Sequence, residues 1–303
     1  MWSLKLPVLL TLLSAPLLAL SALDPSSPVL AGPITEHCIE GAKHAGEPVG
    51  TNVTIANVPT YLSEPTTPPS DEKKKVLLFF SDIYSPFYVN NQLLQDYFAS
   101  EGAFGAFPIP LSTGRGVRNI SRLTEFWAGF NVVGIDYFFG DPVQAHDGEP
   151  GFNMTAWFNK SRAQAERALP GWIEAVRTKY GADAKYAAVG YCFGAPYALE
   201  ISATDKVVAG AFAHPSGLVE AHFSNLTKPL LLSCAETDSA FPTANMRRAV
   251  DILAGKKATY HLQVFSGVSH GFATRADPND ANAVWAKEES ARSVVGWFNR
   301  FSK

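Results

Sequence analysis

The chain is predicted to adopt an α/β fold, with a mostly parallel central sheet and helices on both faces of the sheet. Short apolar runs alternate along the chain with longer segments that have helical periodicity. The short runs are continuously apolar, which is typical of strands buried on both faces of a parallel sheet. Polar residues capable of chemistry follow the ends of several runs, where active groups collect in such sheets.

The predicted elements alternate regularly through most of the chain. Strands are expected at residues 76–80, 131–136, 185–189, 207–213, 229–234 and 260–265. Helices are expected at residues 90–99, 159–180, 193–203, 243–253 and 281–301. Pro170-Gly171 interrupts the second of these helices, so a kink or two shorter helices are expected there.

Two segments do not follow this alternation. Residues 23–75 are rich in Pro, Ser, Gly and charge, and are expected to form an N-terminal arm and loop before a sheet domain at 76–303. Residues 100–127 contain several glycines and prolines without a sustained period. They are interpreted as an irregular insertion, or alternatively as an untranslated segment wrongly included in the gene product.

The composition restricts the class of protein. The 303 residues are 47% hydrophobic and 17% charged, which suits one sizeable globular domain with a full core. The net charge of −3 and the lack of a basic cluster argue against nucleic acid as a partner. We expect a monomer that acts on a small molecule.

The N-terminal residues 1–22 are expected to be a secretory signal peptide, which predicts an extracellular protein. Lys5 supplies a positive charge, an apolar run follows, and small residues come after it. Pro7, Pro16 and the short length of the run argue against a stable membrane span, although a signal anchor is the alternative. Sequons for N-glycosylation support secretion, at Asn52, Asn119, Asn153, Asn159 and Asn225.

The chain has three cysteines, which is few for a secreted protein of this size. The odd number means that at least one thiol stays reduced or pairs with another molecule. Cys38 and Cys234 are candidates for a disulfide that the sequence alone does not establish. Cys192 is the natural candidate for the reduced thiol.

Residues 187–197, AAVGYCFGAPY, contain the most informative motif. The stretch from Gly190 to Gly194 has the G-x-nucleophile-x-G pattern of the nucleophile elbow of α/β-hydrolases, with Cys192 in place of serine. The glycines permit a strained, closely packed turn between a strand and a helix. The helix N-terminus would favour a thiolate. The alternative is a glycine-flanked strand end with a buried structural cysteine.

Further polar residues at predicted strand ends favour the elbow. Asp82, Asp238 and His270 each follow a strand, and the order nucleophile, acid, histidine is that of α/β-hydrolases. We predict that Cys192 attacks an acyl carbon and that His270 acts as general base. Asp238 would hold the imidazole in the useful tautomer. Each residue alone also has a structural explanation, but their common position and order favour a triad.

Two backbone N–H groups are candidate oxyanion donors, and two other side chains are alternatives for the predicted base and acid. The backbone N–H groups of Ile83 and Phe193 are expected to form the oxyanion hole, because they follow the first core strand and the nucleophile. His214 competes with the predicted base, and Glu236 competes more weakly with the predicted acid. Asp82 has the alternative role of capping the segment that follows it.

With these residues placed, the chain resembles the dienelactone hydrolase family, in particular its secreted fungal members. The similarity covers residues 76–303 apart from the insertion. It rests on FFSDIYSPFYVNNQLLQDYFA, GYCFGAPY, PLLLSCAETDSAFP and VSHGFATR before the last helix. The resemblance implies an α/β-hydrolase fold with a Cys-His-Asp triad, which opens an unsaturated lactone without a metal or another cofactor.

The resemblance also implies two supporting groups. Family members place a carboxylate, usually glutamate, beside the thiol to control its ionisation, and Asp82 occupies that place here. Bacterial members hold a substrate carboxylate with arginines, and Arg275 lies one residue from one such position.

The predicted function is that of a secreted hydrolase that opens a lactone or ester through an acyl-enzyme on Cys192. Three alternatives stay open from the sequence. They are a generic short-chain carboxylesterase, a non-catalytic secreted binding protein of the same fold, and a thiol redox or transfer protein that uses Cys192 with Cys38 or Cys234.

Overall fold

The computed structural model describes residues 23–24, 26–34, 36–65, 74–100 and 129–303. The predicted signal peptide, the sequon at Asn119 and the predicted insertion after residue 100 lie outside these residues.

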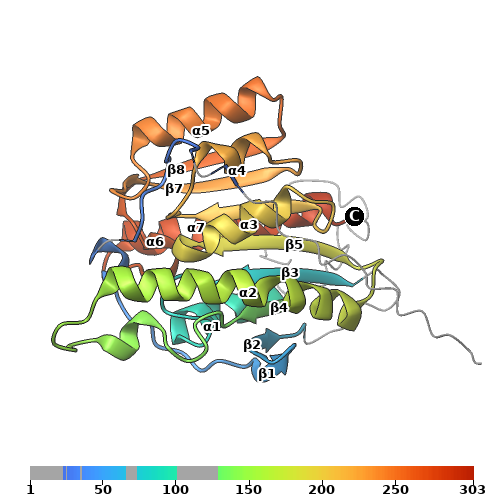
Figure 1. Cartoon of the computed structure of the whole chain (residues 1–303), viewed down its shortest axis with the longest axis horizontal. Coiled ribbons are helices and arrows are strands. Elements are labelled where there is room, and N and C mark those ends of the chain that lie inside the picture. The colour runs from blue at the N-terminus through green and yellow to red at the C-terminus, as the bar shows by residue number, and fades with distance from the viewer. Residues whose placement is uncertain (1–22, 25, 35, 66–73, 101–128) are drawn as a thin grey trace, which may run out of the picture.

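One eight-stranded sheet runs through the molecule in the order β1-β2-β4-β3-β5-β6-β7-β8 (Figure 1). β2 pairs antiparallel with β1 and β4, and the remaining neighbours pair in parallel. The strands are β1 (Thr51–Ile55), β2 (Val58–Ser63), β3 (Lys75–Phe80), β4 (Asn131–Ile135), β5 (Lys185–Tyr191), β6 (Ala209–Ala213), β7 (Leu230–Thr237) and β8 (Tyr260–Ser269). The predicted mostly parallel sheet is confirmed, and each predicted strand is present.

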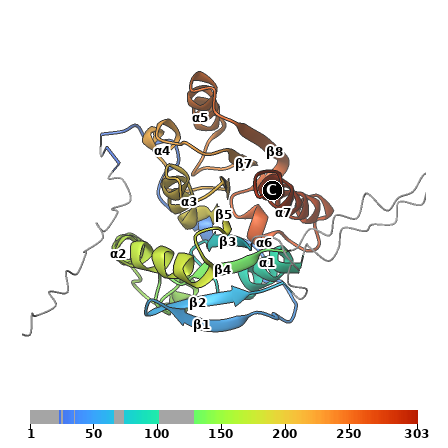
Figure 2. The same cartoon turned by 90° about the vertical axis from the view of Figure 1, so that its right-hand side faces the viewer.

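Helices cover both faces of the sheet, as predicted. α1 (Val89–Ser100) and α7 (Ala281–Phe301) lie on one face, where Phe98 and Phe298 enter an apolar cluster. α2 (Met154–Tyr180) and α3 (Ala195–Ser202) lie on the other face, and α5 (Thr243–Gly255) shares an apolar cluster with α3. Figure 2 shows α2 and α3 on the side of the sheet opposite α1 and α7.

The structure differs from the sequence prediction in residues 23–75. This segment was expected to be an arm and loop, but it contributes the β1–β2 hairpin to the sheet. The hairpin turns at Ala56 and Asn57, which have φ of 49° and 62°. Turns of this kind usually carry glycine, and Ala56-Asn57 therefore does not indicate a hairpin. Helix α2 holds β2 in place, because Trp172 Nε1 donates to Thr60 Oγ1 at 2.9 Å.

α2 is one helix, so of the two expectations for Pro170-Gly171, a kink or two shorter helices, the second is wrong. Proline deprives the carbonyl four residues earlier of its helical partner. That residue is Glu166, which lies on the exposed face of the helix, where its carbonyl is open to solvent rather than buried. The helix therefore continues through the proline.

Short helices lie in the segments between the longer elements. They are η1 (Glu36–Ile39), η3 (Val143–His146), η4 (Cys192–Gly194), α4 (Glu220–Ser224) and α6 (Phe272–Arg275). Among the described residues, no helix is both long and apolar enough to cross a membrane. Four predicted glycosylation positions, Asn52, Asn153, Asn159 and Asn225, are exposed.

Candidate active site

The turn that carries Cys192 has the geometry expected of a nucleophile elbow. Cys192 has φ of +46°, a conformation that L-residues rarely adopt, between the end of β5 and the start of α3. A Cβ added to Gly190 would come closer than 3.0 Å to the Gly194 carbonyl oxygen, and one added to Gly194 would meet the Phe80 carbonyl equally closely. Backbone packing therefore requires glycine at both positions. The alternative, a strand end with a buried structural cysteine, does not explain this requirement.

Asp238 and His270 form a buried pair at the ends of β7 and β8. His270 Nδ1 lies 3.0 Å from both carboxylate oxygens of Asp238, and both side chains are 2% exposed. Asp238 Oδ1 also accepts from the backbone N–H groups of Ala240 and Phe241 at 2.9 and 3.0 Å. The carboxylate is thus fixed by its own turn, and it orients the imidazole so that Nε2 faces the cysteine.

The electrostatics of this pair set the charge of the base. Burial alone lowers the pKa of His270, but hydrogen bonds to Asp238 and to the thiol of Cys38 outweigh it and raise the pKa to about 9. The His214 ring centroid lies 5.2 Å from that of His270, and burial lowers the pKa of His214 well below its usual value. Because Asp238 contacts only one of the two imidazoles, His270 is the better placed base.

Glu236, the alternative to Asp238 as the acid, lies away from His270. Glu236 is exposed, and its carboxylate accepts from the backbone N–H of Gly267 at 2.8 Å. It does not take the position that Asp238 holds against His270.

Cys38 is a component of the site that the sequence did not indicate. Its sulfur lies 3.4 Å from His270 Nε2, and the sulfurs of Cys38 and Cys192 and this nitrogen all lie within 4.8 Å of one another. The Cys192 sulfur contacts Ser216 Oγ at 3.7 Å. The structure contains no disulfide between Cys38 and Cys234. Cys38, Cys192 and His270 also bring three possible metal-ligand atoms within 4.8 Å of one another.

The Cys192 thiol is held in its neutral form. Burial raises its pKa well above the usual value, and Cys38 and the negative charge of Asp82 raise it further, whereas Arg275 lowers it. The sequence had suggested that the helix N-terminus would make Cys192 a thiolate. In the structure, desolvation is the larger influence, so an adjacent base has to remove the proton.

Arg275 takes a different place from the one expected for a substrate-binding arginine. It is 3% exposed and forms an ion pair with Asp82. It also donates to the carbonyl oxygens of Cys38 at 2.7 Å and Glu40 at 2.9 Å. Its guanidinium lies 4.7 Å from the ring centroid of Tyr84. Arg275 therefore ties the segment that carries Cys38 to the sheet.

Asp82 lies at the end of β3 and is fully engaged. Besides Arg275, it accepts from Thr274 Oγ1 at 3.0 Å, from Asn91 Nδ2 at 2.9 Å and from the backbone N–H of Tyr84 at 3.1 Å. The last contact is the capping role that was the alternative for this residue. Its influence on Cys192 is exerted through charge, and Arg275 balances that charge.

The expected oxyanion donors lie at the same end of the sheet. Phe193 follows the nucleophile in η4, and Ile83 follows Asp82 after β3. Ile83 is fixed by the hydrogen bond that its carbonyl accepts from Val143 N at 3.1 Å. Their role as oxyanion donors stays a prediction.

The comparisons with known proteins agree with this geometry. The model of the dienelactone hydrolase family matches residues 58–302. The chain belongs to that family.

Two curated relatives show how far the similarity to this dienelactone hydrolase family extends. Dienlactone hydrolase 1 of Gibberella moniliformis is 31% identical over 283 residues, covering 91% of this chain and 97% of the relative. Hydrolase pyvD of Aspergillus violaceofuscus is 29% identical over 272 residues, covering 89% and 98%. A solved structure of a putative dienelactone hydrolase from Klebsiella pneumoniae superposes with a TM-score of 0.62 at 14% identity, covering 84% of this chain and 99% of that one. The last comparison shows the α/β-hydrolase fold.

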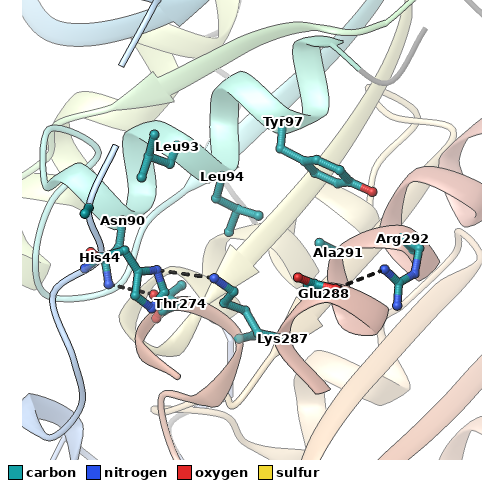
Figure 3. A pocket seen from close by; sticks show the side chains of 12 residues that line it. His44, Asn90, Leu93, Leu94, Tyr97, Thr274, Lys287, Glu288, Ala291 and Arg292 are labelled. Carbon is teal, nitrogen blue, oxygen red and sulfur yellow. Dashed lines mark hydrogen bonds and ion pairs between the residues drawn. The ribbon is translucent and has the colours of Figure 1, made fainter. Parts of the chain in front are cut away.

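A cavity of about 310 Å³ lies between α1 and α7. Figure 3 shows His44, Asn90 and Lys287 at one end of it and Tyr97 and Arg292 at the other. Cys192, Asp238 and His270 do not line this cavity. The layer between them contains Thr274, which lines the cavity and also donates to Asp82.

Proposed function

We propose that this dienelactone hydrolase family member opens a lactone or ester through an acyl-enzyme on Cys192. The observation that carries the proposal is the positive φ of Cys192 between two glycines that have no room for a Cβ, with the Asp238–His270 pair beside it. Strain of this kind is retained where it serves a site. It is the geometry of a nucleophile elbow at a strand–helix turn.

The steps follow from the positions of the groups. Because its pKa is raised to about 9, His270 acts as a base only in its neutral form, whose share grows as the pH approaches 9. In that form Nε2 takes the Cys192 proton as the sulfur bonds to the carbonyl carbon, and Asp238 stabilises the resulting imidazolium. The carbonyl oxygen becomes an oxyanion, and we expect the backbone N–H groups of Ile83 and Phe193 to donate to it. Collapse breaks the C–O bond, and the leaving oxygen takes the proton from His270. Water, activated by the same imidazole, then releases the acid and regenerates the thiol.

Before His270 can take this proton, its Nε2 has to contact the sulfur of Cys192 instead of the sulfur of Cys38. In the structure, His270 Nε2 contacts the Cys38 sulfur, with the Cys192 sulfur within 4.8 Å. Catalytic hydrogen bonds are often long before substrate binds and shorten in the complex.

The test is hydrolysis of p-nitrophenyl acetate and of a dienelactone by matched variants. Cys192→Ala and His270→Ala are expected to lower kcat/KM by at least about 10³-fold, because members of such a triad act as a unit. Cys234→Ala is the control, since it removes a buried thiol outside the site. Undiminished turnover in either triad variant would reject the mechanism, and ligand affinity without any hydrolysis would favour the binding protein.

The same proposal covers the extracellular location. Its support is the leader-like composition of residues 1–22 and the exposure of four sequon asparagines. N-terminal sequencing and glycosidase treatment of protein from the medium of expressing cells test it. An intact residue 1 or retention inside the cells would contradict it.

A further inference from the structure

Three soft or borderline donor atoms meet at the catalytic turn, one more than the proposed hydrolysis uses. They are the sulfurs of Cys38 and Cys192 and Nε2 of His270, all within 4.8 Å of one another. Tetrahedral zinc, with Zn–S of about 2.3 Å and Zn–N of about 2.0 Å, needs donor separations of about 3.5 to 3.8 Å. The distance of 3.4 Å between the Cys38 sulfur and Nε2 is close to that value.

The imidazole already has the orientation of a metal ligand. His270 Nδ1 faces the Asp238 carboxylate at 3.0 Å, so the proton of a neutral ring lies on Nδ1 and the lone pair of Nε2 points toward the two sulfurs. Carboxylate–histidine–metal arrangements are the usual support of zinc sites, because the carboxylate fixes both the tautomer and the ring. Asp238 is itself held by two backbone N–H groups.

A divalent cation would compensate the negative charge that two thiolates carry at this buried site. Cys38 and Cys192 are each 0% exposed, and a lone buried thiolate would lack compensation. One divalent ion with two thiolates forms a neutral group, and the protons held by the two sulfurs and by His270 Nε2 leave to solvent as it binds. The neighbouring Arg275 adds no net charge, because it is paired with Asp82.

The position of Cys38 is defined by the rest of the fold. Arg275 Nη2 donates to the Cys38 carbonyl at 2.7 Å, and Arg275 Nε donates to that of Glu40 at 2.9 Å. Gly41, with φ of +122°, leaves no room for a Cβ against Arg275. The third ligand is thus held at the site before an ion arrives, which lowers the cost of ordering it.

We propose that Cys38, Cys192 and His270 form a binding site for one thiophilic divalent cation of the zinc class. The site goes beyond the proposed hydrolysis, and cation binding does not depend on it. Nothing in the sequence had predicted a metal. An ion here occupies both the nucleophile and the base, so it inhibits the enzyme and is no cofactor. Thiolate and imidazole donors select zinc and cadmium over magnesium and calcium.

Reduced full-length protein, treated with a phosphine reductant, provides the direct test. Zn²⁺ binding is measured by calorimetry, and Co²⁺ binding is followed by the thiolate-to-cobalt charge-transfer absorption. One ion per chain and a clear thiolate band are expected for the wild type. Cys38→Ala is expected to weaken binding by at least about 100-fold, since even residues behind the ligands change metal affinity by 10–100-fold. Cys234→Ala is the matched thiol control and should bind as the wild type does.

Hydrolysis gives a separate readout. Wild-type ester hydrolysis should fall in proportion to Zn²⁺ occupancy and return when a chelator is added, and Mg²⁺ should have no effect. If the wild type hydrolyses nothing, the proposed function fails while calorimetry and absorption still decide the cation site. Equal affinity in the wild type and Cys38→Ala, or Co²⁺ bound without a thiolate band, would overturn the proposal in favour of surface histidines. Cys38→Ser replaces Cys38→Ala should the latter not fold.

Discussion

Gly194 shows how closely the backbone is packed around the nucleophile. A Cβ at this position would meet the carbonyl oxygen of Phe80, which is backbone of a central strand and has no freedom to move aside. The site is therefore sensitive to a single added methyl group.

Gly194→Ala is expected to destabilise the protein by roughly 1–3 kcal/mol or more, the usual cost of overpacking. Hydrolysis should also fall, because the turn that carries Cys192 has to shift. Gly171→Ala is the control, since nothing lies within 4 Å of its added Cβ inside α2. That change should stabilise by about 0.5–1 kcal/mol. Urea unfolding of both variants measures this, and an unaffected Gly194→Ala protein would contradict the packing.

The His270–Asp238 pair makes stability depend on pH. The His270 pKa is raised from 6.5 to about 9, so the folded state holds a proton more tightly than the unfolded chain does. The resulting stabilisation is fully present below pH 6.5 and is lost as the pH rises through about 9. Its size is up to about 3 kcal/mol.

Asp238→Asn should therefore lose most stability relative to the wild type near pH 6.5. The difference should shrink as the pH approaches 9, because the wild-type imidazolium loses its proton there. Unfolding free energies of the two proteins at several pH values test this. A difference that grows with pH would show that Asp238 does not raise the His270 pKa.

At this scale the sequence located some groups and missed others for a physical reason. Cys192, Asp238 and His270 follow strands of a parallel sheet, so their position near one another follows from topology. Cys38 lies in a short 3-10 helix outside the alternating pattern, and no periodicity connects it to residue 270. The role of Arg275 was misplaced, because its ion pair with Asp82 depends on the path of the same irregular segment.

Among the elements, the segment 38–44 depends on α6 and α1 for its position. Arg275 in α6 donates to the carbonyls of Cys38 and Glu40, and Asn90 Nδ2 in α1 donates to that of Ala42 at 2.9 Å. His44 Nε2 lies 2.9 Å from the Ala276 carbonyl oxygen. The segment has little regular structure, so these contacts replace the hydrogen bonds of a helix or strand.

Arg275→Ala is expected to cost about 3–5 kcal/mol, because it leaves the buried Asp82 carboxylate without its partner. Limited proteolysis should then cut within residues 38–44, which have lost their anchor. Arg292→Ala, at an exposed arginine paired with Glu288 and Glu289, is the control and should cost less than about 1 kcal/mol. Equal losses in both variants would show that the ion pair with Asp82 contributes no more than a surface pair.

The elements that the sequence missed share one property. β1 and β2 lie at the antiparallel edge of the sheet, and the hairpin turns without glycine at Ala56-Asn57. The central strands β3 and β5 were predicted because both of their faces are buried and they read as continuous apolar runs. β1 is exposed over most of its length and has no such run.

For the whole molecule, alternation of strands and helices was sufficient to predict the fold. Parallel strands require crossovers, and right-handed crossovers leave few arrangements of a sheet covered on both faces. The mixed edge formed by β1, β2 and β4 could not be predicted in this way, since it is decided by pairing between distant segments. The details of the site depend on such distant pairing as well.

The N-terminal residues that reach the catalytic turn have a consequence for biosynthesis. Cys38 is made early, but Arg275, which holds it, is made 237 residues later. The backbone N–H of Leu30 likewise donates to the carbonyl of Leu218, and Asn245 donates to the Leu30 carbonyl 215 residues away. On the ribosome, the contacts of Cys38 with His270 and Arg275 therefore form only after those two residues have emerged. The proposed catalytic centre is therefore completed late in synthesis, and a chain that ends before residue 270 does not possess it.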